Sequence, residues 1–131
     1  MNEEILAKVQ DAIQESLGAP REKITLKAKL IEDLDSDSLD FLDILFALEE
    51  KFDIKLKRGQ IEAEARAGIA NGEFEVDGMI TAQGAKRLKE VLPEVDHSQI
   101  KENMPLSTIP TLFTVETFYR LVEHQLAKKA E

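Results

Sequence analysis

Hydrophobic residues recur every three or four positions near both ends of the chain, which is the spacing of one face of an α-helix. Near the amino end this pattern predicts a helix that Asn2 caps and that Gly18 and Pro20 end. Thr114 precedes a second such stretch, which predicts a helix at the carboxyl end. The same spacing from Leu39 to Phe52 predicts a third helix, so the expected fold class is all-α.

The chain between the amino-terminal helix and the helix predicted from Leu39, residues 19–36, is a long loop with a marked apolar content. Five of its side chains are expected to hold it against the core: Ile24, Leu26, Leu30, Ile31 and Leu34. We therefore predict that this loop packs on the helices and does not extend into solvent.

The middle of the chain has a weaker pattern. A helix is predicted from Arg58 to Ala70, with Asn71-Gly72 ending it. Asp77-Gly78 lies between short apolar flanks, which predicts a tiny β-hairpin near residues 73–80.

Two further helical stretches are predicted after this hairpin. Thr81 begins a helix that Pro93 ends, and Asp96 with Gln99 resembles a capping box for one or two turns. No repeat, low-complexity tract or linker demands a second domain, so a single domain over residues 1–131 is expected.

The predicted helix 39–52 has three faces when its residues are placed at 100° intervals. A core face is formed by Phe41, Ile44, Leu45, Leu48 and Phe52. An acidic face is formed by Asp40, Asp43, Ala47 and Glu50, and an apolar flank beside it by Leu39, Leu42 and Phe46. This flank is either a second packing surface or an interaction face, and the adjacent carboxylates favour an interaction face.

Composition and charge narrow the function. A formal charge of −9 opposes binding to nucleic-acid phosphates and favours partners with basic surfaces. The absence of cysteine excludes disulfides, thiolate metal sites and a cysteine nucleophile. The amino terminus does not resemble a targeting sequence, and no apolar run is long enough to span a bilayer, so a cytoplasmic protein is predicted.

The stretch D-L-D-S-D-S-L-D, residues 33–40, has three interpretations. It resembles the start of a calcium-binding EF-hand loop, but Ser38 stands where glycine is needed and Ile44 where a bidentate glutamate is needed. It is also a helix cap, through Asp37 or Ser38. A single cap residue does not explain the composition of the helix that follows. The third interpretation is a place where a group is attached to a serine.

The residues resemble those of the acyl carrier proteins. The family signature, Asp-Ser-Leu and an acidic residue at the start of an acidic helix, matches residues 37–40, preceded by Glu32-Asp33-Leu34 and followed by residues 47–54. The resemblance covers residues 1 to about 56 and resumes near residue 106. It implies a four-helix bundle in which Ser38 carries 4′-phosphopantetheine, added from coenzyme A by a separate transferase, although Ser36 is a rival acceptor. Free backbone N–H groups at the helix start are expected to meet the phosphodiester.

The resemblance also implies a role for other residues of this helix. Acidic side chains would meet basic groups of the transferase and of acyl-handling enzymes: Asp37, Asp40, Asp43, Glu49, Glu50 and Asp53. Leu39 and Phe46 would contact the same partners. Phe41-Leu42-Asp43-Ile44 and Phe46 additionally resemble the carriers of very long acyl chains for lipid A synthesis.

The chain departs from the family pattern between its second and last helices. Residues 57–105 are read as an insertion, either an elaborated surface segment or a lid or wall that selects cargo or enzymes. The family's short penultimate helix is not recognisable around residues 107–113, where Pro110 intervenes, and Lys51 replaces an expected acid.

The expected function is that of a stand-alone, monomeric acyl carrier for fatty-acid or specialised lipid synthesis. An aminoacyl or polyketide carrier and an unmodified acidic interaction module are the alternatives. No catalytic residues and no metal site are predicted, and His97 and His124 are expected to be isolated.

Overall fold

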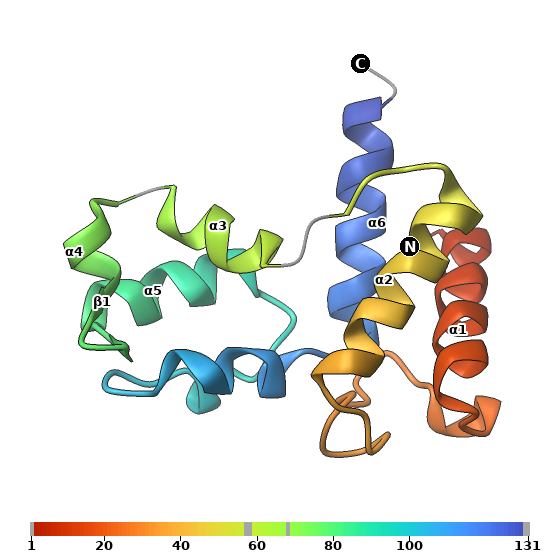
Figure 1. Ribbon diagram of the computed structural model, residues 1–131, viewed down its shortest axis with the longest axis horizontal. Coiled ribbons are helices and arrows are strands. Elements are labelled where there is room, and N and C mark those ends of the chain that lie inside the picture. Colours follow the sequence, from red (N-terminus) through yellow and green to blue (C-terminus); the bar gives the residue numbers. More distant parts are fainter. Residues whose placement is uncertain (1, 57–58, 68, 130–131) are drawn as a thin grey trace. The chain divides into compact units, whose positions relative to one another are not determined.

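The computed structural model describes residues 2–56, 59–67 and 69–129; for Ser38 and Asn71 it describes the backbone. The chain divides into two compact units, one formed by residues 1–58 and 113–131 and the other by residues 59–112 (Figure 1). We call them the first and the second unit. Both are built mainly of helices, so the predicted all-α class is confirmed. The expectation of a single domain with an insertion at 57–105 stays a prediction.

Three long helices build the first unit. They are α1 (Glu3–Leu17), α2 (Ser38–Phe52) and α6 (Val115–Lys129), and a single 3-10 turn, η1 (Arg21–Lys23), follows α1. Side chains from all three helices and from the loop after α1 form its buried core: Val9, Ala12, Ile13, Ile24, Leu30, Ile44, Leu48, Val115, Phe118 and Val122.

Local capping explains where α1 begins and ends and where α6 begins. The side chain of Asn2 accepts hydrogen bonds from the N–H groups of Glu4 and Ile5, and Gly18 ends α1 with a φ of 69°. At the start of α6, the hydroxyl of Thr114 accepts from the N–H of Thr117 at 3.3 Å. These three predicted caps are confirmed.

The loop between α1 and α2 is tied to the start of α6 through the backbone. The N–H of Leu30 donates to the carbonyl of Phe113 at 3.1 Å, and the N–H of Val115 donates to the carbonyl of Ala28 at 3.1 Å. Of the five apolar residues expected to anchor the loop, Ile24, Leu30 and Leu34 are buried, whereas Leu26 and Ile31 are half-buried.

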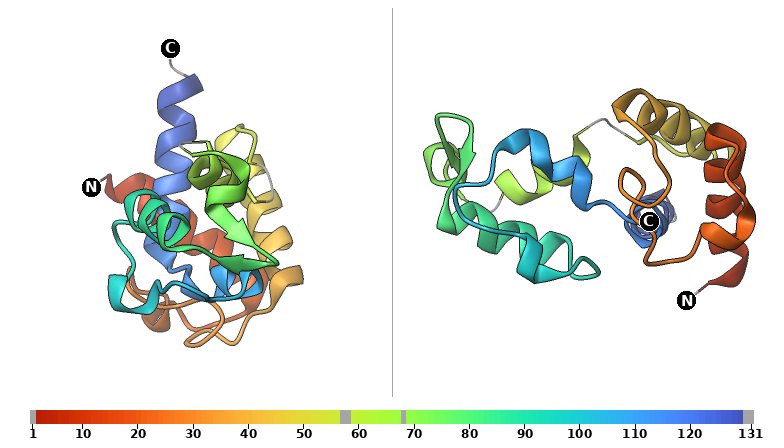
Figure 2. Two further views of the ribbon diagram at one scale, coloured as in Figure 1. Left: turned by 90° about the vertical axis from the view of Figure 1, so that its left-hand side faces the viewer. Right: turned by 90° about the horizontal axis from the view of Figure 1, so that it is seen from below.

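The second unit contains short helices around a two-stranded hairpin. Its elements are α3 (Gln60–Arg66), α4 (Asn71–Phe74), β1 (Glu75–Val76), β2 (Met79–Ile80), α5 (Ala82–Val91) and the 3-10 helices η2 (His97–Gln99) and η3 (Leu106–Leu112). The predicted hairpin is confirmed, because β1 and β2 pair antiparallel and both turn residues, Asp77 and Gly78, have positive φ (Figure 2).

The predicted helices of this unit are partly confirmed. Thr81 caps α5 and Asp96 caps η2, as expected. Two predictions are wrong. Asn71-Gly72 does not end a long helix but begins α4, since α3 already ends at Arg66. A helical segment, η3, also exists at 106–112, although Pro110 lies inside it. Arg58 and Gly68, at and within the predicted helix 58–70, lie outside the described residues.

Tyr119 connects α6 to the amino end of α1. Its hydroxyl accepts from the N–H of Asn2 at 2.7 Å and donates to the carboxylate of Glu123 at 2.6 Å. Burial of the ring, followed by the hydrogen bond to Glu123, raises the pKa of Tyr119 above its ordinary value near 10. The folded protein therefore retains the phenol proton at a pH at which the unfolded chain releases it.

This pKa shift predicts a loss of stability in alkali. The contribution is fully present below the unfolded pKa and is lost as the pH rises through the higher folded pKa. We expect the free energy of unfolding to fall more steeply above pH ~10 in the wild type than in Tyr119→Phe, which has no such proton. Urea unfolding of both proteins from pH 8 to 11 measures this difference, since the two chains differ only at residue 119. Parallel curves would contradict it.

Candidate functional site

The start of α2 is held by a complete capping box. The carboxylate of Asp37 accepts hydrogen bonds from the N–H groups of Leu39 and Asp40, at 2.9 and 3.0 Å. In return the carboxylate of Asp40 accepts from the N–H of Asp37 at 2.9 Å. Asp37, and not Ser38, is therefore the N-cap, and Ser38 is the first residue of the helix.

This capping box corrects one expectation about phosphate binding. A phosphodiester at the helix start was expected to meet free backbone N–H groups. Asp37 and Asp40 already bind three of these groups, those of Asp37, Leu39 and Asp40. The two carboxylates also place negative charge where a phosphate would approach.

The two serines of the acidic stretch have different surroundings. Ser36 is buried, with 6% of its surface exposed, and its hydroxyl donates to the carbonyl of Leu30 at 2.7 Å. The backbone N–H of Ser36 donates to the same carbonyl at 3.0 Å. The Ser36 side chain therefore closes the loop ahead of α2 and is not accessible from solvent.

The aspartates before Ser38 stabilise backbone turns. Asp33 accepts from the N–H of Lys29 at 2.8 Å, and Asp35 has a φ of 57°. Together with the cap role of Asp37, this accounts for the features that resembled an EF-hand. Within the described ranges, no three histidine, aspartate or glutamate side chains are grouped as a metal site requires.

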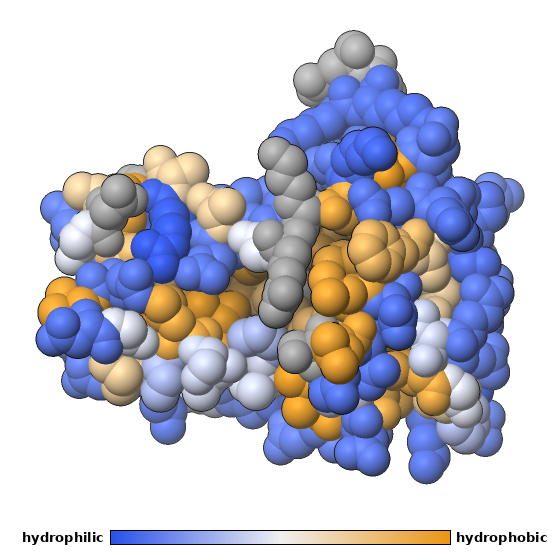
Figure 3. All heavy atoms as spheres, viewed as in Figure 1, coloured by the Kyte–Doolittle hydropathy of each residue, from blue (hydrophilic) through white to orange (hydrophobic). Residues whose placement is uncertain are grey.

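The solvent-facing side of α2 alternates apolar and acidic residues along one line. Leu39 and Phe46 are 69% and 61% exposed, and Asp43 and Glu50 are also exposed. Their spacing of four, three and four residues places them on one face of the helix. We call these four residues the docking stripe. Figure 3 shows hydrophobic side chains over α2 beside hydrophilic ones.

The rest of the expected interaction face is less available. Leu42 is half-buried, so the apolar flank predicted from sequence consists chiefly of Leu39 and Phe46. Of the predicted core face, Phe41, Ile44 and Leu48 are buried. Leu45 and Phe52 are half-buried and pack against the core, which confirms the assignment of the inner side of the helix.

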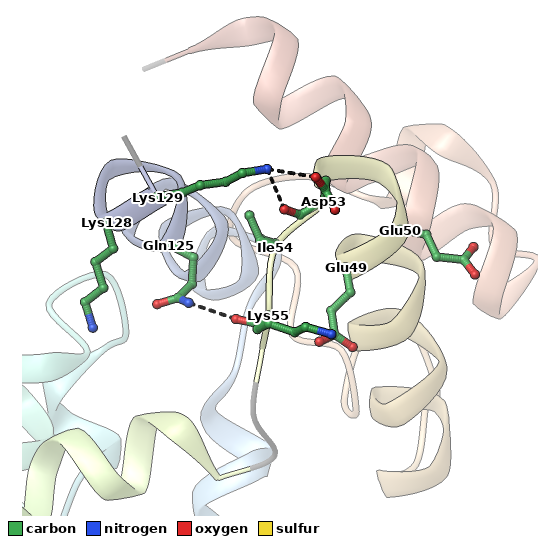
Figure 4. Close-up of a pocket in the computed structure, with 8 residues that line it drawn as sticks. All are labelled: Glu49, Glu50, Asp53, Ile54, Lys55, Gln125, Lys128 and Lys129. Atoms are coloured by element: carbon green, nitrogen blue, oxygen red, sulfur yellow. Dashed lines mark hydrogen bonds and ion pairs between the residues drawn. The ribbon is translucent and has the colours of Figure 1, made fainter. Parts of the chain in front are cut away.

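Glu49 and Asp53 have structural partners at the far end of α2. The carboxylate of Glu49 accepts from the N–H of Leu56 at 2.9 Å, which fixes the chain after the helix. Asp53 adopts a φ of 53° to end α2 and pairs with Lys129 at 3.0 Å. The surface pocket between the ends of α2 and α6 is lined by both residues (Figure 4). It lies about 20 Å along the helix from Ser38, because each residue advances the helix by about 1.5 Å.

An aromatic cluster lies under the first turns of α2. The ring of Phe41 stacks on that of Phe113 at 5.9 Å between centroids and contacts Phe118 edge-on at 5.8 Å. Phe113 and Phe118 meet edge-on at 6.3 Å. The cluster connects the helix that begins at Ser38 to the start of α6.

The two histidines lie at the surface. His97 and His124 are both exposed, and a ring nitrogen of His97 lies 3.3 Å from the carbonyl of Leu92. The role of Ser36 was missed, because its partner Leu30 is defined by the path of the loop and not by a sequence motif. The docking stripe could have been found from the spacing of residues 39, 43, 46 and 50.

Comparison with known proteins agrees with this geometry. Residues 7–66 match the family model described as a phosphopantetheine attachment site. An acyl carrier protein of Borrelia garinii subsp. bavariensis is 41% identical over 71 residues, which is 53% of this chain and 89% of that protein. An acyl carrier protein of Thermotoga maritima is 39% identical over 66 residues, which is 50% of this chain and 82% of that protein. A third acyl carrier protein, of Campylobacter fetus, is 33% identical over 75 residues, which is 57% of this chain and 95% of that protein.

A helical carrier domain with a phosphopantetheine attachment site is the class that the fold and these matches define. The chain belongs to the acyl carrier protein family. It is accordingly a carrier and not an enzyme, and phosphopantetheine is its prosthetic group. Members of the family interact with phosphopantetheinyl transferases and acyl-handling enzymes. Within residues 2–56, 59–67 and 69–129, no helix is both long and apolar enough to cross a membrane.

Proposed function

We propose that Ser38 bears the phosphopantetheine arm, and that the chain carries acyl groups for fatty-acid or specialised lipid synthesis in the cytoplasm as a monomer. The observation that carries the assignment is the burial of Ser36, whose hydroxyl is bound to the carbonyl of Leu30 at 2.7 Å. Of the two candidate serines, this leaves the one that begins α2. The matched family model, which spans residues 7–66, includes this position.

The surroundings of Ser38 suit a large attached group. The capping box of Asp37 and Asp40 fixes the helix start, so the attachment point has a defined position. Leu39, the next residue, is 69% exposed, which supports access to this turn of the helix by a partner enzyme. The arm supplies a thiol, which holds the acyl group as a thioester and which this cysteine-free chain otherwise lacks.

Docking of partner enzymes is assigned to the stripe of Leu39, Asp43, Phe46 and Glu50. Its exposed apolar side chains offer area to a complementary pocket, and its carboxylates attract a basic surface. Among the described residues, neither Asp43 nor Glu50 has an ion-pair partner, so both remain available to a second protein. The other acidic residues of this helix would attract a basic partner through their negative charge more than through direct contacts. Each of them already binds a backbone group or a lysine of its own chain: Asp37, Asp40, Glu49 and Asp53.

Charge reversal on the stripe tests this assignment. Asp43→Lys with Glu50→Lys is expected to raise the KM of the phosphopantetheinyl transferase for the carrier about tenfold, with kcat nearly unchanged, since exposed charges act mainly on association. The loss should shrink as salt is added.

The matched control reverses two exposed acids outside α2, Glu4→Lys with Glu22→Lys. It alters the net charge equally and is expected to leave KM within about twofold. Equal effects of the two double variants would show that only total charge matters, and would remove the stripe from the proposal.

The proposed function is tested by intact-protein mass spectrometry. The purified chain is incubated with coenzyme A and a promiscuous transferase, and one phosphopantetheine mass is expected. A wild type that gains no mass, while a control carrier does, would favour an unmodified acidic interaction module. For protein isolated from its source, the mass of the attached acyl group separates a fatty-acid cargo from a specialised lipid, aminoacyl or polyketide cargo.

A further inference from the structure

The hairpin of the second unit continues into a third, adjacent segment. Met79 pairs with Val76 across the hairpin and with Pro105 on its other side. The backbone is closed there by hydrogen bonds from the N–H of Ile80 to the carbonyl of Met104, at 2.8 Å, and from the N–H of Leu106 to the carbonyl of Gly78, at 3.0 Å. The three paired residues therefore lie in a row held by backbone pairing.

This row faces solvent although its residues are apolar. Directly paired residues of antiparallel strands share one face, so Val76, Met79 and Pro105 lie on the same side. Val76 is 57% and Met79 36% exposed, and Pro105 is exposed as well. The neighbouring residue Ile80 is fully buried, which shows that the core lies on the other side. We call the three residues the hairpin patch.

The hairpin patch has acidic surroundings. The hairpin and the segment paired with it, residues 73–80 and 102–106, contain four acidic and no basic residues. Glu75 is bound to Arg66 at 3.1 Å, whereas Glu73, Asp77 and Glu102 are exposed. Exposed apolar side chains beside carboxylates are also the chemistry of the docking stripe on α2. The large exposed hydrophobic residues among the described part of the chain are Leu39, Phe46, Val76 and Met79.

We propose that the hairpin patch is a second docking surface, and that its partner is an acyl-handling enzyme with basic side chains around an apolar depression. This inference rests on the proposed carrier function. Charge complementarity selects this occupant: a second copy of the chain would bring its own carboxylates against Asp77 and Glu102, and the chain's net charge is −9. The rigid pairing favours binding, because little conformational entropy is lost. The second unit thus adds partner selection to the carrier.

The partner is identified by photo-crosslinking from the full-length holo-protein in its source cells. A benzophenone amino acid is placed at position 76 or 79, and at Gln83, an exposed residue of α5, as the matched control. An enzyme that acts on acyl thioesters and is captured from 76 or 79, but not from 83, is then purified. Its kcat/KM is measured with wild-type carrier, with Val76→Thr plus Met79→Thr, and with Asp77→Asn.

The threonine variant keeps strand propensity, and asparagine tolerates the positive φ of residue 77. The proposal expects kcat/KM to fall about tenfold for the threonine variant through KM. For Asp77→Asn it expects the kcat/KM of the captured enzyme to depend less on salt concentration. Modification of Ser38 by the transferase is expected to be unchanged in the threonine variant and in Asp77→Asn. The proposal is overturned by adducts no stronger than at 83, by adducts joining two copies, or by a captured enzyme that treats all three carriers alike. Absence of modification in the wild type would instead contradict the carrier function itself.

Discussion

Ser38→Ala is expected to abolish the phosphopantetheine mass gain completely, whereas Ser36→Ala is expected to keep it. The transferase must bring a serine oxygen into its own active site, which requires a hydroxyl that protrudes from the carrier. Ser36 is 6% exposed and directs its hydroxyl inward, to the carbonyl of Leu30 at 2.7 Å. Ser38 instead begins α2, between the N-cap Asp37 and the exposed Leu39.

The Ser36→Ala variant is also expected to lose a little stability. Removing the hydroxyl deletes one buried hydrogen bond, which contributes about 0.5–1.5 kcal/mol. The loss stays small because the carbonyl of Leu30 still accepts the N–H of Ser36 at 3.0 Å. Urea unfolding measures this change beside the mass assay.

These two serine variants also supply the decisive control. Urea unfolding of Ser38→Ala is measured to establish that this variant is folded. Lack of modification can then be ascribed to the missing hydroxyl. Modification of Ser38→Ala, or its loss in a folded Ser36→Ala, would reassign the attachment to Ser36.

Gly84→Ala is expected to disrupt the second unit while leaving the first intact. A Cβ at residue 84 would lie 2.3 Å from the carbonyl oxygen of Phe74 and 3.0 Å from a methyl of Ile80. The carbonyl is backbone and accepts the N–H of Thr81 at 3.0 Å, so the contact can be relieved only by moving α5 away from the hairpin. We expect a cost of about 3 kcal/mol or more, the upper range for overpacking.

Hydrogen–deuterium exchange of peptides from each unit measures this effect. In Gly84→Ala, exchange should accelerate in peptides from 59–112 and remain unchanged in those from 2–56 and 113–129. Gly72→Ala is the matched control in the same unit, because no atom lies within 4 Å of the Cβ it would add. Exchange as slow in Gly84→Ala as in Gly72→Ala would show that α5 can shift without loss of structure.

The same variant also tests how far the carrier depends on the second unit. The docking stripe and Ser38 both belong to the first unit. We therefore expect Gly84→Ala to gain the phosphopantetheine mass at the wild-type rate. A slower gain would show that the transferase needs an ordered second unit.

The sequence alone determined the features that depend on near neighbours in the chain. The caps at Asn2, Gly18 and Thr114 use hydrogen bonds or dihedral angles within a few residues, and Asp77-Gly78 sets its own turn. The inner face of α2 followed from helical periodicity. The family resemblance of residues 37–40 likewise needed only the printed residues and their order.

Only the tertiary structure decided which serines and acidic residues are exposed to a partner and which are engaged within the chain. Ser36 is buried because the loop folds back on Leu30, and Glu49 is engaged because the chain turns after α2 to bring Leu56 near it. Asn71-Gly72 begins a helix where local propensity predicted an end, and the row of Val76, Met79 and Pro105 joins segments 26 residues apart. Exposure and pairing between distant segments depend on the path of the whole chain, and local periodicity contains no information about that path.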